Sequence, residues 1–308
     1  MKASENDTPD SLRFQAFESG QLAKDYFLAN IPASGLQYVH FEDQKKGKVK
    51  IWITVVITHD DHAASLPNSP FGGFWCEKGL NSTALEKFIE MVTEYLKARG
   101  VKSLTIVQPP KNYEPYSDLV NYLLFKLGWD LKKILSHQFY SGSKKIEKYL
   151  MTEGPKIRKK LKASGLTTSH HPISNFDFLK KIKAWNSLKG YESSINEDYL
   201  VQQVSSYPER YFLLKLEKGE QVLGFVLAVL LTSNSIYYFL SGLDSSKESK
   251  GGGDFLLFEL FLLAKEQKVD FIDLGSSDLG DRANHNLMFF KARFSNDISN
   301  KLTWSKEF

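Results

Sequence analysis

Apolar and polar residues follow two different periods along this chain, and each change of period marks a predicted element. Residues 48–58 are rich in β-branched and aromatic side chains, which predicts a strand. Farther along, apolar residues recur at helical spacing from Ser82 until Gly100, and a strand follows at 103–107. The apolar face of this helix comprises Leu85, Phe88, Ile89, Val92, Tyr95 and Leu96. We therefore expect the first sheet to begin at residue 48 and Ser82 to cap the first helix.

The next elements divide the chain into two halves. They are a helix at 117–127, a strand at 129–140 and a charged helix at 143–164. We place the link between the halves in the charged helix, so the predicted domains are 1–150 and 151–308.

The second half predicts two helices followed by consecutive strands. The helices are expected at 176–189 and 196–205, and the strands at 211–217, 222–231 and 235–243. A glycine run then opens a strongly apolar helix at 254–267, and a short buried strand follows at 271–274. Strand, loop, helix and strand in this order form a βαβ arrangement.

A pattern of loop, helix and strand occurs in both halves. When Val101 is set against Val269, the apolar positions of the two helices and strands coincide. The matched pairs include Phe88 with Leu256, Val92 with Leu260, Leu104 with Ile272 and Ile106 with Leu274. A duplicated domain would give this alignment, and so would two unrelated amphipathic helices followed by strands. The fold class predicted is α/β with two similar halves.

The composition fits two packed domains and excludes several classes of protein. The chain has 308 residues, 42% of them hydrophobic and 25% charged, which is typical of folded globular proteins. Its net charge of +4 is small for a dedicated nucleic-acid-binding protein, so nucleic acid is not an expected partner. The single cysteine, Cys76, excludes an intramolecular disulfide and favours a reducing compartment. We therefore expect a cytoplasmic protein.

Two further patterns bear on location. The polar first nine residues lack the basic-then-apolar order of a secretory signal. The most apolar run, 222–231, is much shorter than the roughly 20 residues that a membrane-spanning helix needs. No membrane span is expected.

A glycine-rich segment between an apolar strand and an apolar helix is the strongest local candidate for a binding site. The segment is Ser249-Lys250-Gly251-Gly252-Gly253-Asp254. Glycines permit a ligand to approach the backbone closely, and the free N–H groups of a helix N-terminus attract anions. A pyrophosphate-containing ligand would suit this site, although a flexible loop before a helix would have the same sequence. The P-loop and GxGxxG patterns are both absent.

Several short motifs in a fixed order resemble the FemAB-like branch of the GNAT acyltransferase superfamily. In the second half they are YYFLSG at 237–242, the glycine before the apolar helix, FIDLG at 271–275 and FFKARF at 289–294. Earlier in the chain they are SPFGG at 69–73, the prolines at 109–110 and the basic tract at 156–162. The resemblance covers most of the chain, from Lys48 to Phe294.

The resemblance implies two GNAT-like domains in tandem, each a mixed, mostly antiparallel sheet flanked by helices. It implies an N-acyltransferase that moves an acyl group, in particular acetyl, from acyl-CoA to a primary amine without a metal. In this family the donor lies between two splayed strands, with its pyrophosphate at the following loop. The matching positions, which we expect to bind the donor, are Phe239, Ser241, Leu243, Lys250, Gly251, Gly252, Gly253 and Asp254. Where the family's loop has Arg or Gln, this chain has Glu248, which leaves the identity of the donor open.

Three side chains are candidates for catalysis. Phe290-Lys291 matches the family's Phe-Lys pair, which implies that the Lys291 ammonium faces the transfer site, where a cation would stabilise an oxyanion. The alternative is an exposed lysine on a short helix. Asp273 ends a buried strand, where it would act as a general base or pair with a neighbouring loop. The hydroxyl of Tyr238 is a candidate partner for the leaving thiolate, unless this side chain only packs in the sheet.

Histidine pairs at 59 and 62 and at 170 and 171 invite a metal interpretation. Both pairs fall in predicted loops without further ligands at characteristic spacing, so we expect solvated histidines and no metal site.

Two other functions remain open. One uses aminoacyl-tRNA as the donor, with the basic tract at 156–162 contacting phosphates, and the other is a catalytically inactive GNAT-like ligand-binding module. The acceptor is open between an amino sugar, a cell-envelope precursor, a peptide and a polyamine, and so is the oligomeric state.

Overall fold

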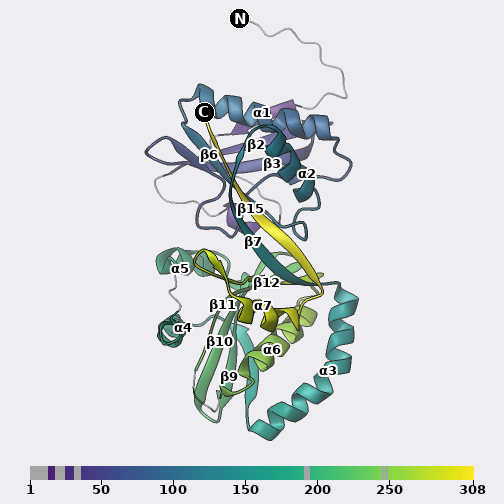
Figure 1. Ribbon diagram of the computed structural model, residues 1–308, viewed down its shortest axis with the longest axis vertical. Helices are drawn as coiled ribbons and strands as arrows, with labels where there is room; N and C mark the ends of the chain where they lie inside the picture. Colours follow the sequence, from purple (N-terminus) through teal and green to yellow (C-terminus); the bar gives the residue numbers. More distant parts are fainter. Residues whose placement is uncertain (1–12, 18–24, 31–35, 191–194, 245, 247–248) are drawn as a thin grey trace, which may run out of the picture. The chain divides into compact units, whose positions relative to one another are not determined.

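The computed structural model describes residues 13–17, 25–30, 36–190, 195–244, 246 and 249–308 (Figure 1). The described residues form two compact units. Unit 1 comprises 13–17, Leu28–Ile134 and Asn300–Phe308, and unit 2 comprises Asp25–Phe27 and the described part of Leu135–Ser299.

These units differ from the predicted halves at both ends. The chain leaves unit 1 at Ile134 and returns to it at Asn300, whereas the sequence placed one boundary at residue 150. These two crossings fall inside strands, β7 (Asp130–Ser141) and β15 (Asp297–Glu307), and the short segment Asp25–Phe27 also belongs to unit 2. A strand that continues from one unit into the next shows no break in its pattern of apolar and polar residues. The sequence therefore contains no signal for the unit boundaries at Ile134 and Asn300.

The sheet of unit 1 is antiparallel except for one parallel pair, β4–β6. Its strand order is β1-β2-β3-β4-β6-β15, and β5 pairs with β3. The remaining strands are β1 (Arg13–Phe17), β2 (Gln37–Lys45), β3 (Lys48–Ile57), β4 (His62–Ala64), β5 (Trp75–Cys76) and β6 (Ser103–Gln108).

This sheet begins earlier than the sequence predicted. β2 pairs with β3 through a two-residue turn in which Lys46 and Gly47 have φ of 52° and 71°, the geometry of a tight hairpin. β2 also carries His40 and Asp43 at buried positions, and these polar residues interrupt its apolar pattern. The expectation of a sheet that starts at residue 48 is therefore wrong.

Two helices cover one face of the unit 1 sheet, α1 (Ser82–Ala98) and α2 (Ser117–Lys126). The predicted apolar face of α1 is confirmed, because its buried side chains come from that set and pack against β2, β3 and β6. The cap is Asn81 and not Ser82, since the Asn81 Oδ1 accepts a hydrogen bond from the Ala84 N–H at 2.7 Å.

The sheet of unit 2 has the order β7-β12-β11-β10-β9-β8 and is antiparallel except for the pair β11–β12. A separate small hairpin pairs β13 with β14. The strands are β8 (Thr167–Pro172), β9 (Tyr211–Lys218), β10 (Gln221–Thr232), β11 (Ser235–Leu243), β12 (Phe271–Ser276), β13 (Asp278–Leu279) and β14 (Arg282–Ala283).

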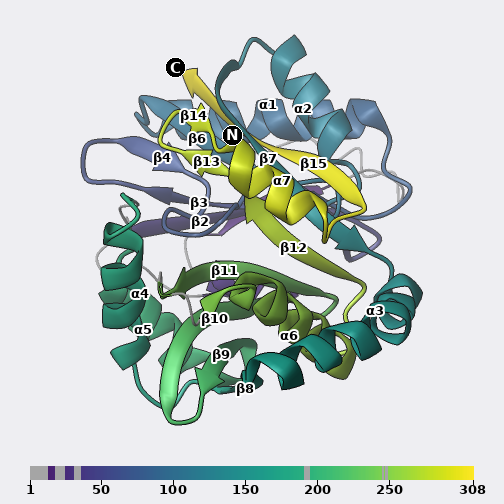
Figure 2. The same cartoon turned by 60° about the horizontal axis from the view of Figure 1, so that its bottom comes forward.

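Helices lie on both faces of this sheet (Figure 2). On β10, Phe225 stacks on Trp185 of α4, while the next residue, Val226, packs in the core that contains α6. Successive strand residues face opposite sides, so α4 and α6 cover opposite faces. The helices are α3 (Ser143–Ser164), α4 (Asp177–Ser187), α5 (Glu197–Ser206), α6 (Gly252–Glu266) and α7 (His285–Ala292), with 3-10 turns η1 (Phe27–Asn30) and η2 (Pro208–Arg210).

The register of the two parallel pairs agrees with the repeat seen in the sequence. In β6, Ser103, Leu104 and Thr105 pair with β4; the three residues aligned with them, Phe271, Ile272 and Asp273 of β12, pair with β11. The same three steps of parallel pairing therefore occur in each unit, as a tandem arrangement of two similar folds requires. The α/β prediction is confirmed.

Candidate functional site

The parallel strands β11 and β12 separate after three residue pairs, the last of which is Tyr237 with Asp273. β11 continues to Leu243 and β12 continues to Ser276. Residues of both strands beyond the last pair line a pocket of about 740 Å³, which is within the size range of small-molecule sites. The divergence of two parallel strands thus creates the largest pocket described in unit 2.

Six of the predicted site residues meet in this pocket. They are Tyr238, Phe239, Ser241, Leu243, Gly253 and Lys291. Asp273 lies outside its described lining, and so do Lys250, Gly251, Gly252 and Asp254. The fold thus gathers β11 and α7 side chains that are about 50 residues apart, and their roles remain predictions.

Lys291 is a buried lysine at the end of α7. Lys291 is only 5% exposed. Its Nζ donates a hydrogen bond to the Ser276 carbonyl at 2.5 Å. Burial lowers the pKa of Lys291 to about 8, against the opposing effect of the Asp273 and Asp278 carboxylates. The alternative of an exposed lysine on a surface helix is therefore wrong.

Asp273 lies fully buried at the edge of the pocket, next to Leu274 in its wall. Its Oδ1 accepts a hydrogen bond from the Gly275 N–H at 2.7 Å, and both carboxylate oxygens lie 3.1 and 3.2 Å from the Nδ1 of His137. A general base must come within hydrogen-bond reach of the proton that it removes. With these partners, Asp273 is better placed to act on neighbouring charges than to contact an acceptor.

His137 of β7 is a residue that the sequence did not single out. It is 1% exposed, and its ring stacks on Tyr237 at 6.4 Å between centroids. With Nδ1–H donating to Asp273, its Nε2 is left without a hydrogen-bond partner among the described residues. The contact joins positions 136 residues apart, and no local pattern could have revealed it.

Side chains from the end of α4 reach the open edge of β11. Asn186 Nδ2 donates to the Ser241 carbonyl at 3.0 Å, and Lys189 Nζ donates to the Leu243 carbonyl at 2.7 Å. α4 comes so close that a Cβ on Gly242 would lie 2.9 Å from the Cα of Ile182. Asn186 and Lys189 therefore form one wall of the pocket, and no pattern in the sequence singled out either residue.

Packing accounts for two of the three consecutive glycines. A Cβ on Gly252 would lie 2.5 Å from Leu216 Cδ2, and a Cβ on Gly253 would lie 3.0 Å from the ring of Phe290. Gly251, with φ of 79°, precedes the helix and its carbonyl accepts the N–H groups of the third and fourth residues after it. A side chain at Gly252 or Gly253 would force these neighbours to shift, so packing offers an explanation of the glycine run that does not involve a ligand.

The charge at the start of α6 is balanced within the protein. Asp254 accepts two hydrogen bonds from Arg293, at 2.8 and 3.2 Å, and the guanidinium also lies over the rings of Phe290 and Phe294. This contact ties the start of α6 to the end of α7. Glu248, which departs from the family pattern, lies outside the described residues.

In unit 1 the corresponding edge is occupied by the chain itself. Beyond the β4 pairs, the Val107 carbonyl of β6 accepts the N–H groups of Gly72 and Gly73 at 3.0 and 3.1 Å. The Gln108 side chain then bonds both the N–H and the carbonyl of Phe74. The segment that includes SPFGG thus fills the place where a gap opens in unit 2.

The histidine pairs have protein partners. His62 lies in β4 with Nδ1 2.6 Å from the Ser103 hydroxyl, and His170 lies in β8 between the carboxylates of Glu259 and Glu266. His62 and His170 lie in strands and not in the predicted loops, although His62 is exposed; His59 is an exposed turn residue, as predicted. The described residues contain no cluster of three or more acidic, histidine or cysteine side chains that could hold a metal ion.

Among the described helices, none combines the length and the apolar character needed to span a bilayer.

No protein-family model and no curated protein matches this sequence. Solved structures with a similar fold include FemX, at 12% identity and a TM-score of 0.64 over 89% of each chain. A tandem GNAT protein from the clavulanic acid biosynthesis pathway has 9% identity and a TM-score of 0.56 over 96% of this chain and 98% of its own. L-PGS from Bacillus licheniformis has 14% identity and a TM-score of 0.53, covering 83% of this chain and 80% of its own. The chain therefore has the same α/β fold as FemX and the tandem GNAT protein.

Proposed function

We propose that the protein is an N-acyltransferase that moves an acyl group from acyl-CoA, in particular acetyl-CoA, to a primary amine in the unit 2 pocket. The observation that carries this proposal is the divergence of β11 and β12 around a pocket with the buried ammonium of Lys291 in its wall. Proteins of this fold include FemX and a tandem GNAT protein, which supports a transfer reaction.

The proposed reaction is direct. The amine nitrogen bonds to the thioester carbon, the carbon–sulfur bond breaks, and the amine proton is passed to the departing sulfur. Lys291 would hold the carbonyl oxygen as negative charge develops there, and a preorganised cation in a site shielded from water is effective in this role. One of its three hydrogens is held by the Ser276 carbonyl, which fixes the direction of the ammonium.

Tyr238 is proposed to relay this proton: its hydroxyl gives a proton to the sulfur and receives the amine proton in its place. Burial raises the pKa of Tyr238, so its hydroxyl stays protonated at neutral pH. Asp273 is proposed to act through charge, because its carboxylate raises the pKa of Lys291 and so favours the ammonium form. His137 would in turn fix the orientation of that carboxylate.

The acyl-pantetheine would lie along Phe239, Ser241 and Leu243 of β11, with its phosphates towards residues 250–254. Two features of this edge fit an anionic donor: the helix start at Gly252, and Lys189 at the Leu243 carbonyl. The proposed acceptor is a small-molecule or cell-envelope-precursor amine, and the proposed location is the cytoplasm.

The second candidate is a transferase that uses aminoacyl-tRNA as its donor substrate. Helix α3 is the feature that favours it. Several basic side chains of α3 between residues 156 and 162 are exposed. Lys156 forms an ion pair with Glu153, and this pair is also exposed. Such a charged face binds phosphates in a salt-dependent way. Saturable binding of an aminoacyl-tRNA that persists at high salt would support this donor over acyl-CoA.

Calorimetry with acetyl-CoA and a pocket-filling variant tests the proposal. Leu287 of α7 lines the pocket, so Leu287→Trp should reduce affinity at least about tenfold. Leu131→Trp is the matched control, because Leu131 is exposed in unit 1. Equal binding by both folded variants would place the donor elsewhere, and tight binding without transfer to any amine tested would indicate a ligand-binding module.

A further inference from the structure

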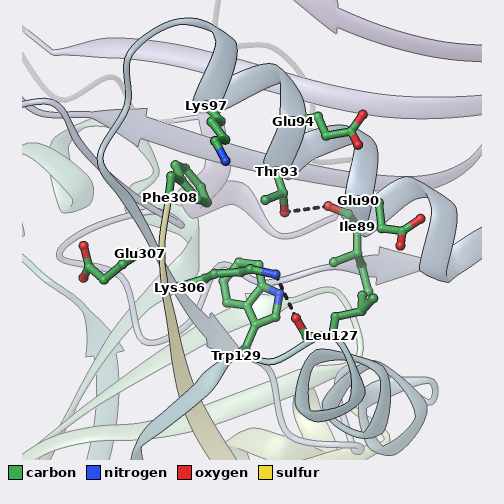
Figure 3. Close-up of a pocket in the computed structure, with 10 residues that line it drawn as sticks. All are labelled: Ile89, Glu90, Thr93, Glu94, Lys97, Leu127, Trp129, Lys306, Glu307 and Phe308. Carbon is green, nitrogen blue, oxygen red and sulfur yellow. Dashed lines mark hydrogen bonds between the residues drawn. The ribbon is translucent and has the colours of Figure 1, made fainter.

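Unit 1 contains a separate pocket of about 300 Å³ (Figure 3). It lies between one face of α1 and the last residues of β15, and it shares no residue with the unit 2 pocket. Its apolar surfaces come from Ile89, Leu127, Trp129 and Phe308. This volume is at the lower end of the range for ligand sites, so only a small molecule would fit.

The indole N–H of Trp129 is a buried donor without an acceptor. Trp129 is 4% exposed, and its Nε1 has no hydrogen-bond partner in the part of the chain that the structure describes. Two other tryptophans contrast with it, since Trp75 donates to the Gly72 carbonyl and Trp304 donates to Asn121. An unpaired buried donor destabilises the folded state. Because this nitrogen is itself buried, a ligand reaches it only when a neighbouring side chain moves, and an acceptor placed there then satisfies the donor.

Lys306 places a cation beside this indole. Its Nζ donates one hydrogen to the Leu127 carbonyl at 2.8 Å, and an ammonium has three hydrogens to donate. Figure 3 draws Lys306, Trp129 and Lys97 in the lining of this one pocket. The indole donor and two ammonium groups therefore belong to the wall of the same pocket.

The acidic side chains around the pocket point away from its interior. The carboxylates of Glu90, Glu94 and Glu307 point outward in Figure 3. The hydroxyl of Thr93 is used locally, because it donates to the Ile89 carbonyl at 2.9 Å. No carboxylate of the described lining is therefore directed at the indole and ammonium donors, and a protonated amine would meet like charge there.

We propose that this pocket binds a small monocarboxylate with an apolar body. Its carboxylate accepts hydrogen bonds from the Trp129 indole N–H and the Lys306 ammonium, and its apolar part lies against Ile89, Leu127 and Phe308. The inference does not depend on the acyltransferase proposal, because it concerns different residues in a different unit.

Trp129 also provides the means to test the proposal. The chain has five tryptophans, so an NMR spectrum of the indole N–H groups should show five resonances, and Trp129→Phe identifies the one that belongs to Trp129. Hexanoate is the probe and hexylamine the control, because they share an apolar chain and differ in head group. Hexanoate should shift the Trp129 resonance in a saturable way, with a Kd on the order of 1 mM.

Two lysine variants separate a carboxylate site from a merely apolar one. Lys306→Met should raise the Kd for hexanoate about tenfold or more, because a charge-assisted hydrogen bond is lost. Lys78→Met, at an exposed position of unit 1, should leave it unchanged. The proposal fails if hexanoate does not shift the Trp129 resonance, if hexylamine shifts it equally, or if folded Lys306→Met binds hexanoate as the wild type does.

Discussion

At Lys291, burial and charge act in opposite directions. Burial favours the neutral amine, while the carboxylates of Asp273 and Asp278 favour the ammonium, and the resulting pKa is about 8. Near neutral pH the side chain is therefore charged, yet it lies close to the point at which it would lose its proton. Two roles follow from this chemistry, a cation below that pH and a base above it, and they predict opposite dependences on pH.

The proposed role is that of the cation. The rate of acyl transfer should then fall as the pH rises through about 8, since the ammonium is lost. Lys291→Met should lower kcat by about 100- to 1,000-fold, the usual effect of losing one oxyanion donor, while the Kd of the donor changes little.

Lys265→Met supplies the control for this measurement, because Lys265 is an exposed lysine of the same unit. Once an acceptor is found, kcat is measured at saturating amine across the pH range. A rate that rises with pH through the same region in the wild type, with this rise absent in Lys291→Met, would assign Lys291 the role of a base.

At the scale of elements, a cluster of charged side chains fastens β8 to α6. His170 of β8 lies 2.7 Å from Glu259 and 3.0 Å from Glu266, which are two turns apart on α6, and Thr168 donates a further hydrogen bond to Glu259. The hydrogen bond to Glu259 raises the pKa of His170, against the effect of burial. Burial alone would raise the pKa of Glu259, but the bonds from His170 and Thr168 lower it.

This cluster predicts a pH-dependent stability. The contribution of a histidine with a raised pKa is complete below its ordinary value of 6.5 and is lost as the pH rises through the raised value. That of Glu259 is present above its ordinary value of 4.5 and is lost as the pH falls. His170→Gln should therefore lower the free energy of unfolding most between these values, by about 1 to 3 kcal/mol.

Denaturant unfolding of His170→Gln and His171→Gln at several pH values checks this prediction. His171 is exposed and adjacent, so its replacement should have little effect. A loss of stability in His170→Gln that is the same at pH values on both sides of 6.5 would exclude the charged pair as its cause.

The elements that the sequence predicted well are those whose pattern is local. The helical spacing of α1 and α6 and the apolar run of β10 are present in the residues themselves. β2 was missed because it buries polar side chains, and β15 was missed because its burial depends on a partner, β6, almost 200 residues away. The site divides in the same way: Lys291 and Tyr238 belong to motifs, whereas His137, Asn186 and Lys189 are brought in by long-range contacts.

At the scale of the whole molecule, the two similar units differ in what lies beyond the last residue pair of their parallel strands. The parallel pair of unit 1 is followed by a segment that bonds to β6 through Gly72 and Gly73, whereas that of unit 2 is followed by a pocket. Because the space beyond the parallel strands is filled in unit 1 and open in unit 2, the account predicts one donor site per chain. Unit 1 is then free to carry a different site, such as the one beside Trp129.

The most direct test of this account is a crystal structure of the protein with bound acetyl-CoA. The account predicts one molecule per chain, with its thioester between β11 and β12 and its carbonyl oxygen within hydrogen-bond distance of the Lys291 Nζ. Acetyl-CoA bound at a site that includes neither strand, or a thioester remote from Lys291, would contradict the assignment of the unit 2 pocket as the transfer site.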